Sequence, residues 1–204
     1  KHQIFSLNFD PASFSLEQAV SKLCEDVISA VRDNNVVLVM LTDRRIEQGK
    51  LPIPAAMAVG AVQHALVNAQ LRCDSNIIVE TATARDPHHF AVLIGLGATG
   101  IYPFLAYETV EQLVEKGVIT LSARQAVLNY RKGINKGLYK IMSKMGISTV
   151  ASYRCSNLFE AVGIDKAVMQ QCFADIPSRL GGAGFDDFQQ DIQQLANVAW
   201  LKRK

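Results

Sequence analysis

The segment Val36-Val37-Leu38-Val39-Met40-Leu41, followed at once by Thr42-Asp43-Arg44-Arg45, decides the fold. Six consecutive apolar residues rich in β-branched side chains are typical of a parallel strand covered on both faces. A second run of this kind, Asn76-Ile77-Ile78-Val79-Glu80-Thr81, also ends in polar residues. We therefore expect both segments to be strands that run in the same direction in one sheet.

Helical patterns alternate with these strands. Ser15-Leu16-Glu17-Gln18 has the spacing of a capping box and predicts a helix to about Arg32. Its expected buried stripe repeats with helical period and comprises Leu16, Ala19, Val20, Leu23, Val27, Ala30 and Val31. Residues 55–70 predict a second helix, rich in small residues. The chain holds four to five such βα units, too few for an eight-fold barrel of about 250 residues. The predicted fold is α/β, with a parallel sheet in a partial, TIM-barrel-like arrangement and a C-terminal helical extension.

The later part of the chain predicts shorter elements. In chain order, these are a helix from Pro87 to about Ile94, a strand at Thr99–Pro103, a helix at 107–116, a long helix from Ser122 to Met145, a strand at Ser148–Ser152, and helices at Ser156–Val162 and Asp165–Phe173. Gly181-Gly182-Ala183-Gly184 is interpreted as a flexible hinge before a helix at 186–199. We expect one domain over 1–176 and the helical extension over 177–204.

Composition excludes several classes of protein. The 204 residues include 21 Lys+Arg and 19 Asp+Glu, a net charge of +2 that argues against a nucleic-acid or membrane-surface protein. The four cysteines form no Cys-x-x-Cys pair, so we expect no metal site and reduced thiols in a cytoplasmic compartment. No apolar run reaches the roughly 20 residues of a membrane span. Because the chain opens with Lys1 rather than Met, we expect an excerpt of a longer polypeptide.

Gly95-Leu96-Gly97-Ala98-Thr99-Gly100 matches the Gly-x-Gly-x-x-Gly pattern of dinucleotide-binding folds. That pattern should follow a strand and open a helix. Here the preceding segment begins like a helix at Pro87, and Pro103 interrupts the helix that should follow. We therefore favour a helix end that turns on glycine. The alternative function is a stand-alone phosphate- or nucleotide-binding module that uses Gly95–Gly100 or Ser148–Arg154.

Two clusters of charged residues suggest further interpretations. Lys132, Lys136, Lys140 and Lys144 would form one cationic stripe on a helix, which could bind phosphate or RNA, face solvent, or meet an acidic surface. No interleaved aromatic residues support nucleic-acid stacking, so we expect no nucleic-acid partner.

The second cluster, His88-His89 with Glu80 and Arg85, follows the end of a strand. Adjacent helical histidines point about 100° apart, so we expect no metal site there. We expect Arg85 to pair with Glu80 or with Asp86.

Several blocks of sequence resemble the large subunit of glutamate synthase. They occur in the same order as in that family and are Leu41–Arg44, Ile78–Thr81 with Ala84-Arg85, His88–Ala91, Pro103–Ala106, Gly137–Thr149, Ser152–Arg154 and Phe159–Gly163. The resemblance covers about residues 1–182 and is to the later part of the central domain. Two positions depart from the family. Glu80-Thr81-Ala82-Thr83-Ala84-Arg85 lacks an acidic residue that the family commonly has, and Arg154-Cys155-Ser156-Asn157 stands where Arg-Gly-Ala-Gln is frequent.

The resemblance implies a parent enzyme that converts glutamine and 2-oxoglutarate to two glutamates with a reduced nicotinamide as electron donor. Implied cofactors of the parent are FMN, an iron–sulfur cluster and NADPH. Implied partners are the amidotransferase and FMN domains of the same chain and the small subunit, in the cytoplasm. The segment itself would hold no catalytic residue, cofactor or metal, and would form a scaffold and part of the ammonia channel wall. Candidate channel or domain-interface residues are Thr42, Glu80, Arg85, Ser148, Thr149, Ser152 and Arg154.

Overall fold

A four-stranded parallel sheet forms the centre of the molecule in a computed structural model that describes residues 1–156 and 158–201. In sheet order, its strands are β1 (His2–Ser6), β3 (Leu38–Thr42), β5 (Asn76–Glu80) and β6 (Gly100–Tyr102). The strands stand in the order in which they occur along the chain, so each crossover advances one position in the same direction. The α/β class and the two predicted parallel strands are confirmed, with strand ends shifted by up to two residues.

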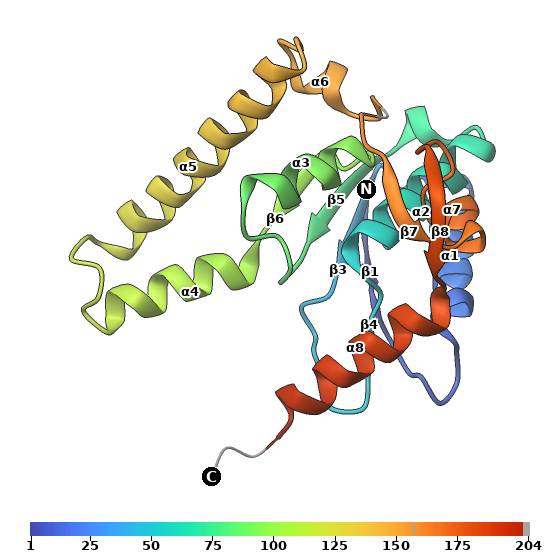
Figure 1. Cartoon of the computed structure of the whole chain (residues 1–204), viewed down its shortest axis with the longest axis horizontal. Coiled ribbons are helices and arrows are strands. Elements are labelled where there is room, and N and C mark those ends of the chain that lie inside the picture. The colour runs from blue at the N-terminus through green and yellow to red at the C-terminus, as the bar shows by residue number, and fades with distance from the viewer. Residues whose placement is uncertain (157, 202–204) are drawn as a thin grey trace.

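Three crossover helices, α1 (Leu16–Asn34), α2 (Ala55–Asn68) and α3 (Pro87–Gly95), pack on the sheet (Figure 1). The capping box of α1 is present: the Ser15 hydroxyl accepts from the Gln18 amide at 3.2 Å, and the Ser15 amide donates to Gln18 Oε1 at 2.9 Å. All seven residues of the predicted stripe are buried. They share one core with side chains of α2 and α3 and with the buried strand residues Phe5, Val39, Leu41, Ile77 and Val79.

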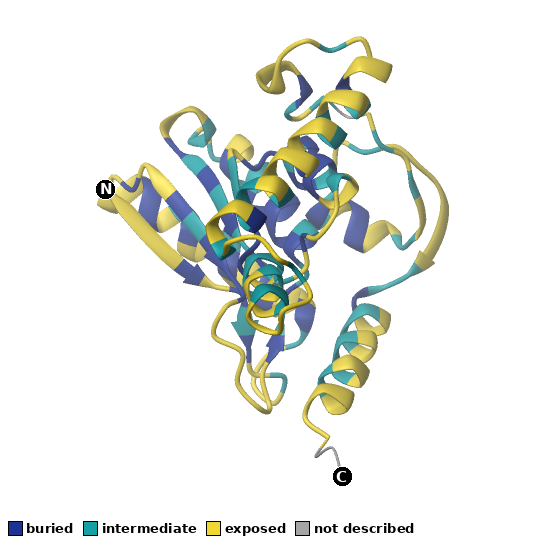
Figure 2. Cartoon of the chain, turned by 90° about the vertical axis from the view of Figure 1, so that its left-hand side faces the viewer, coloured by how far each residue is buried: buried dark blue, intermediate teal, exposed yellow. Residues whose placement is uncertain are grey.

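The opposite face of the sheet is open. Side chains of a strand alternate between faces, and Val39 and Ile77 are fully buried whereas Ile4 is 59% and Leu38 is 38% exposed. Exposed residues of β1 and neighbouring strands lie at the edge marked by the N-terminus in Figure 2. The expectation that these strands are covered on both faces is therefore wrong. The reason is topological, because the three crossover helices share one core on the same face.

Helices α4 (Phe104–Glu115) and α5 (Ala123–Lys144) form a hairpin that projects away from the sheet (Figure 1). Contact with the rest of the molecule occurs mainly where α5 crosses α3. At this crossing Gly137 meets Pro87, and a Cβ atom on residue 137 would overlap the proline ring. Tyr107 and Tyr130 close the hairpin with an edge-to-face contact, their ring centroids 5.8 Å apart. The long predicted helix is confirmed.

The C-terminal third differs most from the prediction. It contains α6 (Val150–Tyr153), β7 (Ala161–Ile164), α7 (Lys166–Cys172), β8 (Ser178–Ala183) and α8 (Phe185–Ala199). The strand predicted at Ser148–Ser152 is wrong, because Thr149 caps a short helix there. The helix predicted at Ser156–Val162 is wrong, because residues 156 and 158–160 have no regular secondary structure and β7 begins at Ala161; residue 157 of that prediction lies outside the described residues.

The glycine segment 181–184 is not a hinge. Gly181, Gly182 and Ala183 belong to β8, which pairs in parallel with β7 in a separate two-stranded sheet. A Cβ atom on Gly182 would overlap the carbonyl group of Gly163, so glycine permits this close approach. Helix α7 is confirmed, and it packs against α2 where a Cβ atom on Gly60 would overlap the Cys172 carbonyl. The division of the chain at residue 176 stays a prediction.

Three small elements complete the described residues. Strands β2 (Asn8–Phe9) and β4 (Leu51–Pro52) pair antiparallel, and the 3-10 helix η1 (Arg72–Asp74) precedes β5. Within the described part of the chain, none of the helices combines the length and the apolar character needed to cross a membrane.

Candidate functional site

Polar side chains gather at the carboxyl edge of the sheet, where parallel α/β folds place their binding sites. The register pairs Thr42, the last residue of β3, with Glu80, the last residue of β5. Their side chains meet directly, because Thr42 Oγ1 donates a hydrogen bond to Glu80 Oε2 at 2.6 Å. Two of the residues singled out from the sequence are therefore neighbours. The parallel register is the physical reason.

Asp43 is the most buried acidic residue of this edge, with 4% of its surface exposed. Its Oδ2 accepts from the Thr81 hydroxyl at 2.5 Å, and its Oδ1 accepts from the Ala82 amide at 3.0 Å. Burial raises the pKa of the Asp43 carboxyl above its ordinary value, and the hydrogen bonds from Thr81 and Ala82 oppose that rise. The carboxyl group thus fastens the end of β3 to the loop that follows β5.

Arg44 connects the same edge to the hairpin. One guanidinium nitrogen donates to Glu80 Oε1 at 2.9 Å, and the other donates to Glu108 Oε1 on α4 at 3.1 Å. The guanidinium also lies over the ring of Phe104, 5.2 Å from its centroid. We refer to Thr42, Asp43, Arg44, Glu80, Thr81 and Glu108 as the carboxyl-edge cluster. Every charged group in it is bound to another member or to a neighbouring backbone group.

Arg85 lies close by in the chain but has a different role from the one expected. Its amide donates to His89 Nδ1 at 3.3 Å, and its carbonyl accepts from the Tyr130 hydroxyl at 2.9 Å. Glu80 pairs with Arg44, and Asp86 with His89, so the ion pairs predicted for Arg85 are wrong within the described residues. Through its backbone, Arg85 joins the start of α3 to α5.

The other four predicted site residues lie at the opposite, amino edge of the sheet. Thr149 and Ser152 are bound to each other at the start of α6, with their hydroxyl oxygens 2.8 Å apart. Arg154 donates to the hydroxyl of Thr99 at 3.1 Å, immediately before β6 begins. Ser148 directly precedes the cap of α6 and is exposed. The structure therefore separates the seven residues into two groups, and α6 lies far from the tips of β3 and β5 (Figure 1).

The glycine motif forms the end of a helix, as favoured from the sequence. Helix α3 ends at Gly95, Gly97 has a φ of 118°, and Gly100 starts β6. Arg72 fastens this turn: it donates to the Gly97 carbonyl at 3.1 Å, to the Ser75 carbonyl at 2.6 Å and to the side chain of Gln63. In a dinucleotide-binding loop the glycines follow a strand and precede a helix. Here they follow helix α3 and precede strand β6, which is the opposite order.

Sequence reasoning missed four members of the carboxyl-edge cluster, which are Asp43, Arg44, Thr81 and Glu108. For the first three, the available signal was their position in the loops after the paired strands, since Asp43 and Thr81 follow Thr42 and Glu80 directly. They were missed because the last residue of each strand was chosen and the loop residues after it were ignored.

The side chains present do not fit the iron–sulfur cluster implied for the parent enzyme. In the described part of the chain, no three His, Cys, Asp or Glu residues stand close enough to hold a metal ion. Burial raises the pKa of Cys24 and of Cys172 to about 12, which makes these thiols poor ligands and poor nucleophiles.

Comparisons with known proteins identify the relatives of this chain. The family model described as the glutamate synthase central domain matches residues 1–165. The chain is 40% identical over 188 residues to the large chain of NADPH glutamate synthase of Bacillus subtilis strain 168, covering 92% of this chain and 12% of that protein.

Two further relatives are glutamate synthases whose names give other electron donors. A ferredoxin-dependent glutamate synthase of Pyropia yezoensis is 36% identical over 213 residues, covering 98% of this chain and 14% of the relative. An NADH glutamate synthase of Saccharomyces cerevisiae is 36% identical over 193 residues, covering 91% of this chain and 9% of the relative. The chain thus spans between 9% and 14% of the length of these three curated relatives.

Proposed function

This chain belongs to the glutamate synthase central-domain family, and from that premise we propose that it is the non-catalytic centre of a glutamate synthase large chain. The parent enzyme would convert glutamine and 2-oxoglutarate to two glutamates in the cytoplasm. This segment would connect its amidotransferase and FMN domains, and the small subunit would bind elsewhere. FMN, the iron–sulfur cluster and NADPH would be held by those other parts.

One observation carries the scaffold role: the carboxyl-edge cluster is already satisfied. Asp43 is bound to Thr81 and Ala82, and Glu80 is bound to Thr42 and Arg44. In a catalytic site, polar groups at this edge are directed toward substrate. Here they hold the ends of β3 and β5 to each other and to α4. A rigid edge of this kind suits a wall between two reaction sites.

The relatives support a role that does not depend on the electron donor. Their names give NADPH, ferredoxin and NADH as donors, yet each matches nearly all of this chain. A segment shared by enzymes with three different donors is best explained by a task common to all of them. Fixing the distance between an ammonia-releasing and an ammonia-consuming site is such a task.

The channel wall is the finer part of this proposal. Ammonia that escapes to water is protonated and is lost as a nucleophile, so a closed passage is required. We propose that Thr42, Glu80 and Arg85 border this passage, and that Ser148, Thr149, Ser152 and Arg154 at the amino edge contact a neighbouring domain. We also propose a partial, TIM-barrel-like sheet, since strands in chain order with helices on one face are features of a barrel segment.

The test is made in the complete glutamate synthase that has this segment as its central domain. Replacing Glu80→Gln removes the negative charge that pairs with Arg44 and leaves one acceptor oxygen in place of the two that Thr42 and Arg44 use, which loosens the wall without changing its shape. We expect glutamine hydrolysis to continue while less of the released ammonia reaches glutamate, so the ratio of glutamate formed to glutamine hydrolysed falls. The control is Glu111→Gln on the exposed surface of α4. An unchanged ratio in Glu80→Gln, or the same fall in both variants, would contradict the proposed wall.

A further inference from the structure

A second candidate site, which is a cavity, lies far from the carboxyl-edge cluster. A cavity of about 580 Å³ opens between α3, the end of α5, α6 and β7. Its walls are mainly apolar and include Val92, Leu96, Ile141, Phe159, Ile164 and Ile176. Pockets of about 300–1,000 Å³ with apolar walls and a few polar groups are characteristic of small-molecule sites. None of the cluster residues lines this cavity.

One buried polar group lines the cavity. Tyr153 is only 2% exposed, and its ring packs edge-to-face on Phe159 with centroids 6.3 Å apart. A tyrosine hydroxyl can both donate and accept hydrogen bonds, so Tyr153 adds a polar group to these mainly apolar walls. Burial also raises the pKa of Tyr153, so its hydroxyl stays protonated and can donate.

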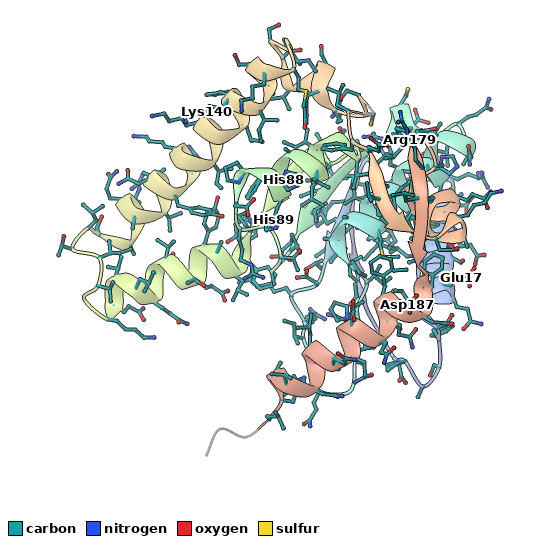
Figure 3. All side chains as sticks on the ribbon, viewed as in Figure 1. Glu17, His88, His89, Lys140, Arg179 and Asp187 are labelled. Carbon is teal, nitrogen blue, oxygen red and sulfur yellow. The ribbon has the colours of Figure 1, made fainter. Side chains whose placement is uncertain are left out.

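Charged groups at the rim favour a negatively charged ligand. Lys144, His88 and Glu160 line the opening. Glu160 is already paired with Arg179, whose Nε lies 3.3 Å from its carboxylate. Lys144 and His88 form no ion pair within residues 1–156 and 158–201. His88 stands in the first turn of α3, and Arg179 on β8 (both labelled in Figure 3). The rim thus has the Lys144 ammonium without an internal counterion, and the imidazole of His88 as a further hydrogen-bonding group.

We propose that this cavity binds a small organic monocarboxylate with an apolar body. The apolar body packs against the walls, the carboxylate lies at the rim beside Lys144 and His88, and the Tyr153 hydroxyl provides one further hydrogen bond. Short dicarboxylates such as 2-oxoglutarate lack an apolar body that would fill these walls. The site is therefore distinct from the chemistry proposed for the parent enzyme, and it does not depend on that proposal.

Decanoate is the probe, and decanol is the matched uncharged molecule. Isothermal titration of the chain with decanoate is expected to show saturable binding at one site. Lys144→Gln should weaken decanoate roughly two- to five-fold, as for a partly exposed ion pair, and leave decanol unchanged. Lys140→Gln removes the same charge one turn earlier, outside the cavity lining, and should leave both affinities unchanged (Lys140 is labelled in Figure 3).

A second variant tests the location. Ala161→Trp places an indole in the cavity and should abolish binding of decanoate and decanol, with a melting curve showing that the chain is folded. If that variant does not fold, Leu158→Trp at the partly exposed rim replaces it. The proposal is overturned if the chain shows no saturable binding, if the tryptophan variant binds as well as the original chain, or if the two lysine variants weaken decanoate equally.

Discussion

The sheet with its crossover helices and the α4–α5 hairpin are held together in different ways. Helix α1 buries seven of its 19 residues, whereas the longer α5 buries three of 22. The sheet half is therefore specified by its own apolar core. The hairpin depends on a few contacts at its base: Gly137 against Pro87, the Tyr130 hydroxyl on the Arg85 carbonyl, and Arg44 between Glu80 and Glu108. A projecting arm with so few anchors is suited to contacts outside this segment.

The largest effect should come from the core under the sheet. Leu41 on β3 is fully buried, and Leu41→Ala removes its side chain and leaves a cavity. We expect the free energy of unfolding to fall by about 2–5 kcal/mol, measured by urea denaturation. The matched change in the hairpin is Leu121→Ala, at a side chain 44% exposed, which should cost less than about 0.5 kcal/mol. If both variants lost the same free energy of unfolding, the sheet half would not be distinguished from the hairpin by its apolar core.

The second-largest loss of stability should come from a substitution at the polar carboxyl edge of the sheet. Asp43→Ala leaves the buried Thr81 hydroxyl and the Ala82 amide without their acceptor, which should cost about 1–3 kcal/mol. Asp191→Ala, on the exposed surface of α8, controls for the loss of an acidic side chain. If both variants unfold at the same urea concentration, Asp43 does not fasten the two loops.

Asp43 also predicts a dependence of stability on pH. Because its pKa is raised in the folded chain, the folded state holds this proton more tightly than the unfolded state. The part of the stability that is linked to this proton is therefore present at acid pH and is lost as pH rises through the raised pKa. Asp43→Asn cannot ionise, so its free energy of unfolding, compared with the original chain, should improve as pH rises from about 3 to about 7. A constant difference over this range would contradict the burial of the charge.

The crossing of α5 over α3 predicts opposite effects at two glycines of one helix. A methyl group on Gly137 meets Pro87, whereas a methyl group on Gly133 meets no atom within 4 Å. Gly133→Ala should stabilise the chain by up to about 1 kcal/mol through helix propensity. For Gly137→Ala, the clash should outweigh that gain, with a net loss of up to about 2 kcal/mol. The melting temperatures of both variants, compared with that of the original chain, test this prediction. A higher melting temperature for Gly137→Ala would mean that α5 does not contact Pro87 as closely as described.

The smallest effect should be at the link between sheet and hairpin. Arg44 is half exposed and its ion pairs are open to solvent, so Arg44→Met should hardly change global stability. Its expected effect is local, with faster amide hydrogen exchange in α4 and unchanged exchange in α1. Arg45→Met, at the next and exposed residue, is the control. Exchange in α4 that matches the original chain would show that Arg44 does not hold the hairpin.

Much of the sheet half could be predicted because local signals and tertiary packing agree there. The capping box at Ser15 and the helical period after it identified all seven buried residues of α1. Thr42 and Glu80 were predicted as the polar ends of two strands, and the parallel register brings them into contact. The bond between Asp43 and Thr81 was missed because it joins two loops, whose geometry no period in the sequence encodes.

In the C-terminal third the helices α7 and α8 could be predicted, but α6 and β8 could not, because tertiary contacts there disagree with the local signals. The hydroxyl groups of Thr149 and Ser152 satisfy the start of a helix, although the residues around them have the composition of a strand. In β8, two glycines with low strand propensity are accepted because Gly182 lies against the Gly163 carbonyl. In both cases, contacts with distant or neighbouring groups override the intrinsic preference of the residues.

The open face of the sheet has a practical consequence for biochemical work on this chain. Ile4 and Leu38 lie on the side away from the shared core, so charged residues can replace them without disturbing the packing beneath. Strand β1 is also at the border of the four-stranded sheet, where unpaired backbone groups invite strands from other molecules. Lysine at these two positions would protect against aggregation at the high concentrations that crystallisation and nuclear magnetic resonance demand.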